Sequence, residues 1–137
     1  MQPRFLFVVG RHVRGVPTPP WPATARAALA DRARTGGWVA WRLVGANHRE
    51  LARSAKVFRN LSDAETAAHD LQARAPQVTS EVLTNSSNGL WWWSVSLDDA
   101  VVAVAAREYQ RPRECVYNLR VALEAVVRAT ICRAGPG

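Results

Sequence analysis

Three consecutive tryptophans, Trp91, Trp92 and Trp93, are the most distinctive side chains in the sequence. On a strand, Trp91 and Trp93 point to one face and Trp92 to the other, because side chains alternate along a strand. By the same alternation, Arg42 points outward from an earlier strand. An arginine beside an exposed aromatic ring can stack on single-stranded nucleic acid, and it is equally typical of protein interfaces. Trp92 and Arg42 therefore form the centre of a candidate binding surface.

The alternative is that the outward face of the sheet is covered. The N-terminal strand or helix, or another subunit, would then pack on Trp92 and make it a core residue. Large rings bury much apolar area, and this sequence has six Trp against three Phe and two Tyr. The residues alone leave both interpretations open.

The N-terminal segment, residues 1–36, carries most of the positive charge of a chain whose formal net charge is +7. It holds six Arg and one acid, Asp31, so its own charge is +5. Arg4, Arg11 and Arg14 extend the candidate surface, and a basic segment favours nucleic acid. However, 17 of the 18 basic residues are Arg and only Lys56 is lysine. Arg and Ala enrichment together is also the product of a GC-rich genome, so the charge has two explanations.

The residue types that usually carry catalysis or hold metals are scattered along the chain: His12, His48, His69, Cys115 and Cys132. No H-E-x-x-H, C-x-x-C, G-x-S-x-G or glycine-rich phosphate loop is present. Both cysteines are expected to be reduced core or near-core residues. Adjacent acids at Asp98-Asp99 suit the tip of a hairpin. We therefore expect no catalytic, cofactor-binding or metal site.

The elements that would position these residues begin with an N-terminal extension and continue with a first unit at residues 37–84. In the extension we expect a strand at Phe5–Val9, a Pro-rich loop, and a helix from Pro22 to Arg34. In the first unit, alternation predicts that Val39, Trp41 and Leu43 share one face. The unit begins with a strand at Trp38–Val44, a turn at Asn47-His48, a strand at Glu50–Ser54 and an extended piece at Lys56–Arg59. A helix follows, with Ser62 as its N-cap and Glu65 completing a capping box, and it ends at Pro76. A strand at Val78–Leu83 completes the unit.

A second unit, residues 85–137, follows the polar loop Thr84–Gly89 and repeats the pattern in degraded form. Aligning Trp93 with Trp41 matches Val95 to Leu43 and, after a one-residue deletion at the hairpin tip, Tyr109 to Phe58. The second helix, which starts after Arg111-Pro112, has an apolar stripe of Val116, Leu119, Leu123, Val126 and Val127. Two copies of about 50 residues indicate an internal duplication, and the whole chain suits one compact domain.

The first unit resembles the YegP-like family of small bacterial proteins of unknown function. The resemblance covers residues 37–76 well, residues 90–130 poorly and residues 1–36 not at all. His48 departs from it, because it stands where the family has a turn glycine, and the second unit keeps few of the signatures. The matching residues are Trp41-Arg42-Leu43, Ala46-Asn47, Ala52, Ser54 and Phe58, followed by an Ala-rich helix.

The resemblance implies paired β-β-β-α units in which the strand after each helix crosses to the other unit's sheet, here Val78–Leu83 and Ala129–Arg133. The family brings no catalytic residues. We therefore expect an α+β fold: an antiparallel sheet from two tandem β-β-β-α units, helices on one face, and an N-terminal β-α extension.

The leading functional prediction is a non-enzymatic binding or interaction module without cofactors; its partner is unknown, with another protein and a second copy as the two candidates. The alternative is weak, salt-sensitive nucleic-acid binding through the Arg-rich extension and the exposed Trp and Arg of the sheet. The apolar run Phe5–Val9 is too short for a secretory signal, and nothing approaches a membrane span. A cytoplasmic protein with no membrane partner is therefore expected. The sequence names no ligand.

Overall fold

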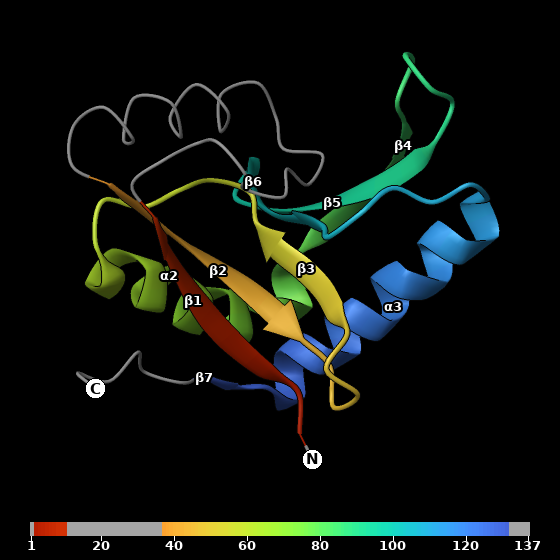
Figure 1. Cartoon of the computed structure of the whole chain (residues 1–137). Helices are drawn as coiled ribbons and strands as arrows, with labels where there is room; N and C mark the ends of the chain where they lie inside the picture. Colours follow the sequence, from red (N-terminus) through yellow and green to blue (C-terminus); the bar gives the residue numbers. More distant parts are fainter. Residues whose placement is uncertain (1, 11–36, 132–137) are drawn as a thin grey trace.

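The computed structural model describes residues 2–10 and 37–131. The predicted N-terminal loop and helix, Arg11, Arg14 and Cys132 lie outside the described residues. The described part is a seven-stranded sheet in the order β4-β5-β6-β3-β2-β1-β7 with helices α2 and α3 against it (Figure 1). The elements are β1 (Arg4–Gly10), β2 (Trp38–Val44), β3 (Glu50–Ser54), α2 (Leu61–Ala73), the 3-10 turn η1 (Ala75–Gln77), β4 (Thr79–Thr84), β5 (Trp91–Leu97), β6 (Ala100–Ala105), α3 (Pro112–Arg128) and β7 (Thr130–Ile131). The predicted α+β class is confirmed.

The sheet is antiparallel at every neighbouring pair except β1 and β7, which are parallel. The strand after each helix pairs with the other half of the sheet, as the resemblance implied. β4 follows α2 but pairs with β5, and β7 follows α3 but pairs with β1. The central contact between the halves is β3 against β6, with Arg53 opposite Val104. The two halves therefore share one continuous sheet.

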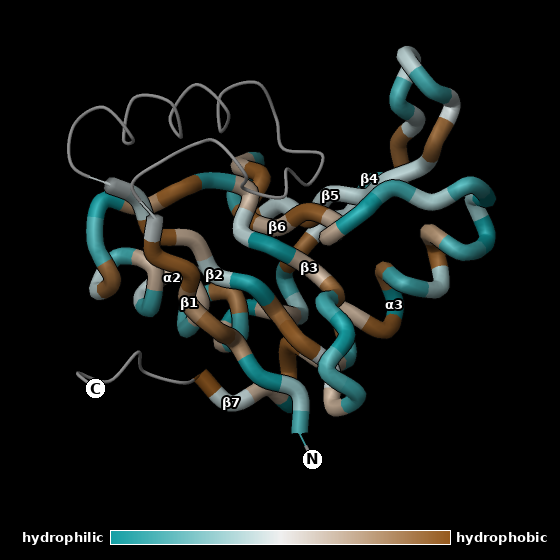
Figure 2. Tube along the Cα trace, viewed as in Figure 1, coloured by the Kyte–Doolittle hydropathy of each residue, from teal (hydrophilic) through white to brown (hydrophobic). Residues whose placement is uncertain are grey.

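Both described helices pack on the same face of the sheet. The core there is built on Trp41 and Trp93, each 1% exposed, which occupy matching positions on β2 and β5. Val39, Trp41 and Leu43 point into this core as the alternation predicted, and Phe5 of β1 meets Trp41 edge to face at 5.1 Å between ring centroids. Hydrophobic residues follow β1 and β2, whereas the β2–β3 turn is mostly hydrophilic (Figure 2).

The second face of the sheet is partly buried. Trp38, Ala40, Ala55, Val57 and Val104 form a second cluster there, and the half-buried Trp92 packs against it. The Trp38 ring packs directly over Gly10 of β1, where a Cβ would lie only 2.5 Å from it. The outward face that carries Trp92 is therefore not bare.

The two hairpin tips adopt left-handed backbone conformations at residues other than glycine. His48 has φ of 66°, and Asp98 and Asp99 have φ of 51° and 64°. The two-residue turn at Asp98-Asp99 requires such angles at both positions, whereas the three-residue turn between Gly45 and Arg49 requires one at its last residue, His48. His48 therefore accepts the strain that the missing turn glycine implied, at a cost of about 1 kcal/mol.

Two details of the first unit differ from the sequence prediction. Helix α2 starts at Leu61 with Asn60 as its N-cap, and the Asn60 side chain accepts a hydrogen bond from the Asp63 N–H at 2.8 Å. The predicted cap at Ser62 was wrong because the amide two residues earlier already satisfies a free helix donor. The predicted extended piece at Lys56–Arg59 forms only one bridge, from Phe58 to Val39.

The buried face of α3 also differs from the predicted stripe. Its buried residues are Cys115, Leu119, Ala122, Ala125 and Val126, whereas Val116 and Val127 are 52% and 62% exposed. The prediction followed the largest apolar side chains. The helix instead turns its alanines inward, because small side chains allow its backbone to approach the sheet closely.

Candidate functional site

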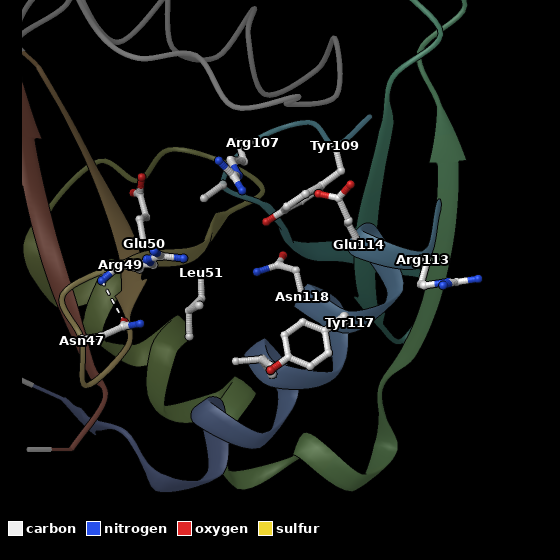
Figure 3. A pocket seen from close by; sticks show the side chains of 12 residues that line it. Asn47, Arg49, Glu50, Leu51, Arg107, Tyr109, Arg113, Glu114, Tyr117 and Asn118 are labelled. Atoms are coloured by element: carbon white, nitrogen blue, oxygen red, sulfur yellow. Dashed lines mark hydrogen bonds between the residues drawn. The ribbon is translucent and has the colours of Figure 1, made fainter. Parts of the chain in front are cut away.

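A pocket of about 1030 Å³ opens between the β2–β3 turn, the β6–α3 connection and the first half of α3 (Figure 3). The segments that form it are far apart in the sequence. They meet because β3 pairs with β6, which places the start of β3 beside the end of β6. The pocket is lined by Asn47, Arg49, Glu50, Leu51, Ala106, Arg107, Tyr109, Arg113, Glu114, Tyr117, Asn118 and Val121.

The β2–β3 turn supplies the first wall. The Asn47 side chain accepts a hydrogen bond from the Arg49 N–H at 3.1 Å, which fixes the turn and leaves the Arg49 side chain exposed at the pocket. Glu50 is already engaged, since its two carboxylate oxygens accept hydrogen bonds from Arg53 Nε at 2.6 Å and Nη2 at 3.2 Å. The Arg42 Nε lies 3.7 Å from the same carboxylate. The negative charge of Glu50 is therefore balanced before any ligand arrives.

Helix α3 supplies the opposite wall, and its central polar residue is Asn118. The indole N–H of Trp93, which is 1% exposed, donates to Asn118 Oδ1 at 2.6 Å. An indole nitrogen is only a donor, so its partner must be the amide oxygen. The amide nitrogen of Asn118 then points into the pocket (Figure 3). Among the described residues it has no hydrogen-bond acceptor.

Tyr109 reaches the pocket from the β6–α3 connection. Its backbone is fixed by two hydrogen bonds with Trp91, both 2.7 Å long, while its hydroxyl points into the pocket (Figure 3). The Arg107 guanidinium lies 4.9 Å from the centre of its ring. Burial raises the pKa of Tyr109 above its ordinary value, and a hydrogen bond from Arg107 opposes this shift. The hydroxyl is therefore protonated at neutral pH and can act as a donor.

The pocket lining carries both signs of charge, three arginines against two glutamates. Arg49 and Arg107 are exposed, and within the described ranges 2–10 and 37–131 neither forms an ion pair with an acid. Arg113 lines the pocket but directs its side chain away from it (Figure 3). Glu114 lies 3.9 Å from Arg111, at the limit of an ion pair. An anion entering the pocket would meet Arg49 and Arg107, which form no ion pair among the described residues, and also the Glu114 carboxylate of the same lining.

The residues predicted as a binding surface lie elsewhere. Arg42 and Trp92 are on the same outward face of the sheet, as alternation predicted, but Trp92 is half-buried and Arg42 lies beside Glu50. The Arg4 guanidinium lies 3.2 Å from His48 Nδ1. None of these residues lines the pocket. Arg11 and Arg14 fall outside the described residues.

Sequence reasoning did not single out Arg107 or Asn118. One signal for Asn118 was present: asparagine is a poor helix former, yet it stands in the interior of a long predicted helix. Such a residue often has a specific hydrogen-bonding role. No comparable local signal marks Arg107, because its place beside Tyr109 and across from Arg49 depends on strand pairing.

With this geometry established, the chain can be compared with known structures. The fold is similar to that of YegP. The solution NMR structure of yegP from E. coli, described as a protein of unknown function, matches with a TM-score of 0.60 and 12% sequence identity, covering 73% of this chain and 85% of that chain. At this identity the likeness shows the fold alone. No protein-family model matches the sequence, and no curated protein matches it.

Two negative findings concern residues 2–10 and 37–131. No group of three or more His, Cys, Asp and Glu side chains gathers closely enough there to hold a metal ion. Helices α2 and α3 are each too short or too polar to cross a membrane, and no other described helix meets that requirement.

Proposed function

We propose that this chain is a non-enzymatic binding module and that the pocket between the β2–β3 turn and α3 is its binding site. The observation that carries the proposal is the convergence of polar groups from three separate segments on one hollow. Arg49, Arg107, Tyr109 and Asn118 meet there, and Asn118 is held in place by the buried Trp93. A concave site with a few fixed polar groups and an apolar lining is the usual form of a small-molecule site.

The composition of the lining supports binding over catalysis. The lining residues in the described part of the chain include no Ser, Thr, Cys, His or Lys. Covalent catalysis needs a nucleophile beside a base, and for these roles the lining offers only two glutamates and two tyrosines. Glu50 is bonded to Arg53 through both carboxylate oxygens, so its lone pairs are engaged.

We also infer that the chain is a diverged YegP-like protein with tandem units at residues 37–84 and 85–137. Matching positions in the two halves support this. Isolated bridges join Val39 to Phe58 and Trp91 to Tyr109, which are the pairs that the alignment equates. The strand register is interrupted after Leu43 in β2 and after Val95 in β5, and these residues are also equivalent.

Nucleic-acid binding through the N-terminal arginines stays a prediction, because Arg11 and Arg14 lie outside the described residues. Its distinguishing property is a steep loss of affinity as salt rises.

The proposed function can be tested by recording ¹H–¹⁵N spectra of the full chain with a panel of small aromatic probes of different charge and with a ten-residue oligo-dT. We expect at least one small probe to shift the signals of the pocket lining. Ala106→Trp should abolish the shift by filling the pocket, whereas Ala73→Trp, at an exposed position on α2, should not. Chemical conversion of a probe that stops with Ala106→Trp would refute a non-enzymatic module. Shifts confined to other surfaces, or none, would refute the pocket as the site.

A further inference from the structure

We infer that the ligand of this pocket carries a carboxylate or phosphate group on a flat apolar body. The inference rests on the proposed function of the pocket as a binding site, and it adds the chemical class of the ligand. Three properties of the pocket carry it: its uncompensated charge, the kind of hydrogen-bonding group that it presents, and its shape.

The charge favours an anion. Arg49 and Arg107 reach the pocket from the β2–β3 turn and the β6–α3 connection, and among the described residues neither has an acidic partner. The acid between these segments, Glu50, is bonded to Arg53 at 2.6 Å and lies 3.7 Å from Arg42. Glu50 is therefore engaged with other arginines, and the second acid of the lining, Glu114, lies 3.9 Å from Arg111. Guanidinium groups bind carboxylates and phosphates strongly because their paired N–H groups match two oxygens at once.

The uncharged polar groups favour an acceptor as well. The oxygen of Asn118 is occupied by the Trp93 N–H at 2.6 Å, so only its amide nitrogen, a donor, is available to a ligand. The hydroxyl of Tyr109 points to the same region (Figure 3). Two guanidinium groups, an amide nitrogen and a phenol therefore surround one space with donors. A carboxylate or phosphate can accept from all four, whereas these four groups offer a ligand ammonium group only the phenol oxygen as an acceptor.

The remaining wall favours an apolar body attached to the anionic group. Leu51 and Val121 line the pocket together with Tyr117, whose side chain is 60% exposed. The Arg120 guanidinium lies 5.4 Å from the centre of the Tyr117 ring and holds it from one side. A volume of about 1030 Å³ is far larger than a single phosphate ion needs and suits a drug-sized molecule.

The experiment uses the full chain and compares probes that differ in charge but share a ring. Benzoate and phenyl phosphate are the anionic probes, benzamide is the neutral probe and benzylamine is the cationic probe, while acetate and inorganic phosphate carry charge without a ring. Titrations followed by ¹H–¹⁵N spectra give an affinity for each. We expect both aromatic anions to bind at the pocket at least tenfold more tightly than benzamide, benzylamine or the ring-free ions. Their relative affinities decide between carboxylate and phosphate.

Arginine variants supply matched controls. Arg49→Gln and Arg107→Gln should each weaken binding of the aromatic anions by about tenfold, the effect of losing one charge-assisted contact. Arg113→Gln removes the same charge from the same rim but from a side chain that points away, so we expect a change below about twofold (Figure 3). An equal loss in all three variants would mean general attraction of anions and would overturn the inference.

The outcomes separate this inference from the proposed function. If benzamide or benzylamine binds at the pocket as tightly as benzoate, the anionic ligand is refuted while the binding site stands. If inorganic phosphate binds as tightly as phenyl phosphate, the apolar body is refuted. If no probe shifts the lining, both the inference and the proposed function fail.

Discussion

The hydrogen bond between Trp93 and Asn118 offers the sharpest test of the structure, because it joins the core to the pocket. Replacing Asn118 by Leu removes the acceptor and leaves the indole N–H of a residue that is 1% exposed facing a methyl group. Leucine suits this test better than alanine, since its bulk keeps water from replacing the amide. A buried donor left without a partner costs about 1–3 kcal/mol, while leucine gains about 0.5 kcal/mol as the better helix former. We expect a net loss of about 1–2 kcal/mol in the free energy of unfolding.

A double-mutant cycle isolates the hydrogen bond from the other effects of the substitution. Trp93→Phe removes the donor and keeps an aromatic ring in the core. In that background Asn118→Leu should be neutral or slightly stabilising, which gives a coupling energy of about 1–3 kcal/mol. The measurement is urea unfolding followed by far-UV circular dichroism, because fluorescence would mix signals from six tryptophans.

The reasoning is refuted if Asn118→Leu costs the same in both backgrounds within about 0.5 kcal/mol, the usual limit of additivity. Asn118→Asp serves as the control, since a carboxylate still accepts from Trp93. We expect this variant to keep most of the stability but to lose affinity for anionic probes, because it adds a negative charge to the pocket and has no amide N–H to donate. Stability and binding would then separate at one residue.

Three further predictions concern the fold. Asp99→Gly should stabilise the chain by about 0.5–1 kcal/mol, since φ of 64° strains any side chain. A lower melting temperature of this variant would contradict the prediction. Asp98→Gly should gain less stability, because it also removes a 2.7 Å contact with Arg74. Gln72→Leu should lower the free energy of unfolding by about 1–2 kcal/mol, because the Gln72 amide donates at 2.9 and 2.7 Å to two carbonyls at the end of α3. An unchanged midpoint of urea unfolding would contradict this. Burial raises the pKa of Cys115 from about 9 to about 11, so the native state holds this proton more tightly than the unfolded state does. The wild type should therefore lose stability between pH 9 and pH 11, whereas Cys115→Ala should not. Equal pH profiles of stability for the two proteins would contradict this prediction.

The sequence predicted the local parts of the fold well where one residue's neighbours along the chain decide its structure. The bounds of β3 were predicted correctly, and the alternation of Trp41 and Leu43 identified the core face of β2. The strain at His48 followed from the missing turn glycine. The errors arose where two local solutions compete. Asn60 and Ser62 are both good N-caps, and the face of α3 depends on whether large or small side chains meet the sheet.

The candidate site was beyond local reasoning. Its walls come from the β2–β3 turn and from α3, which belong to different predicted units. Arg49 and Arg107 are unremarkable among the many arginines of the chain until the pairing of β3 with β6 brings their segments together. The run of tryptophans drew attention to Trp92, whereas Trp93 contributes through its contact with Asn118.

By itself, then, the sequence determined the period of each strand and helix, the positions of the hairpin tips and the class of the fold. These properties depend on side-chain alternation and on turn conformations that act within a few residues. Only the tertiary structure decided that part of the outward face is buried and that four donors converge on one pocket. Such features depend on contacts between distant segments, and many different pairings of the same strands satisfy the same local pattern of apolar and polar residues.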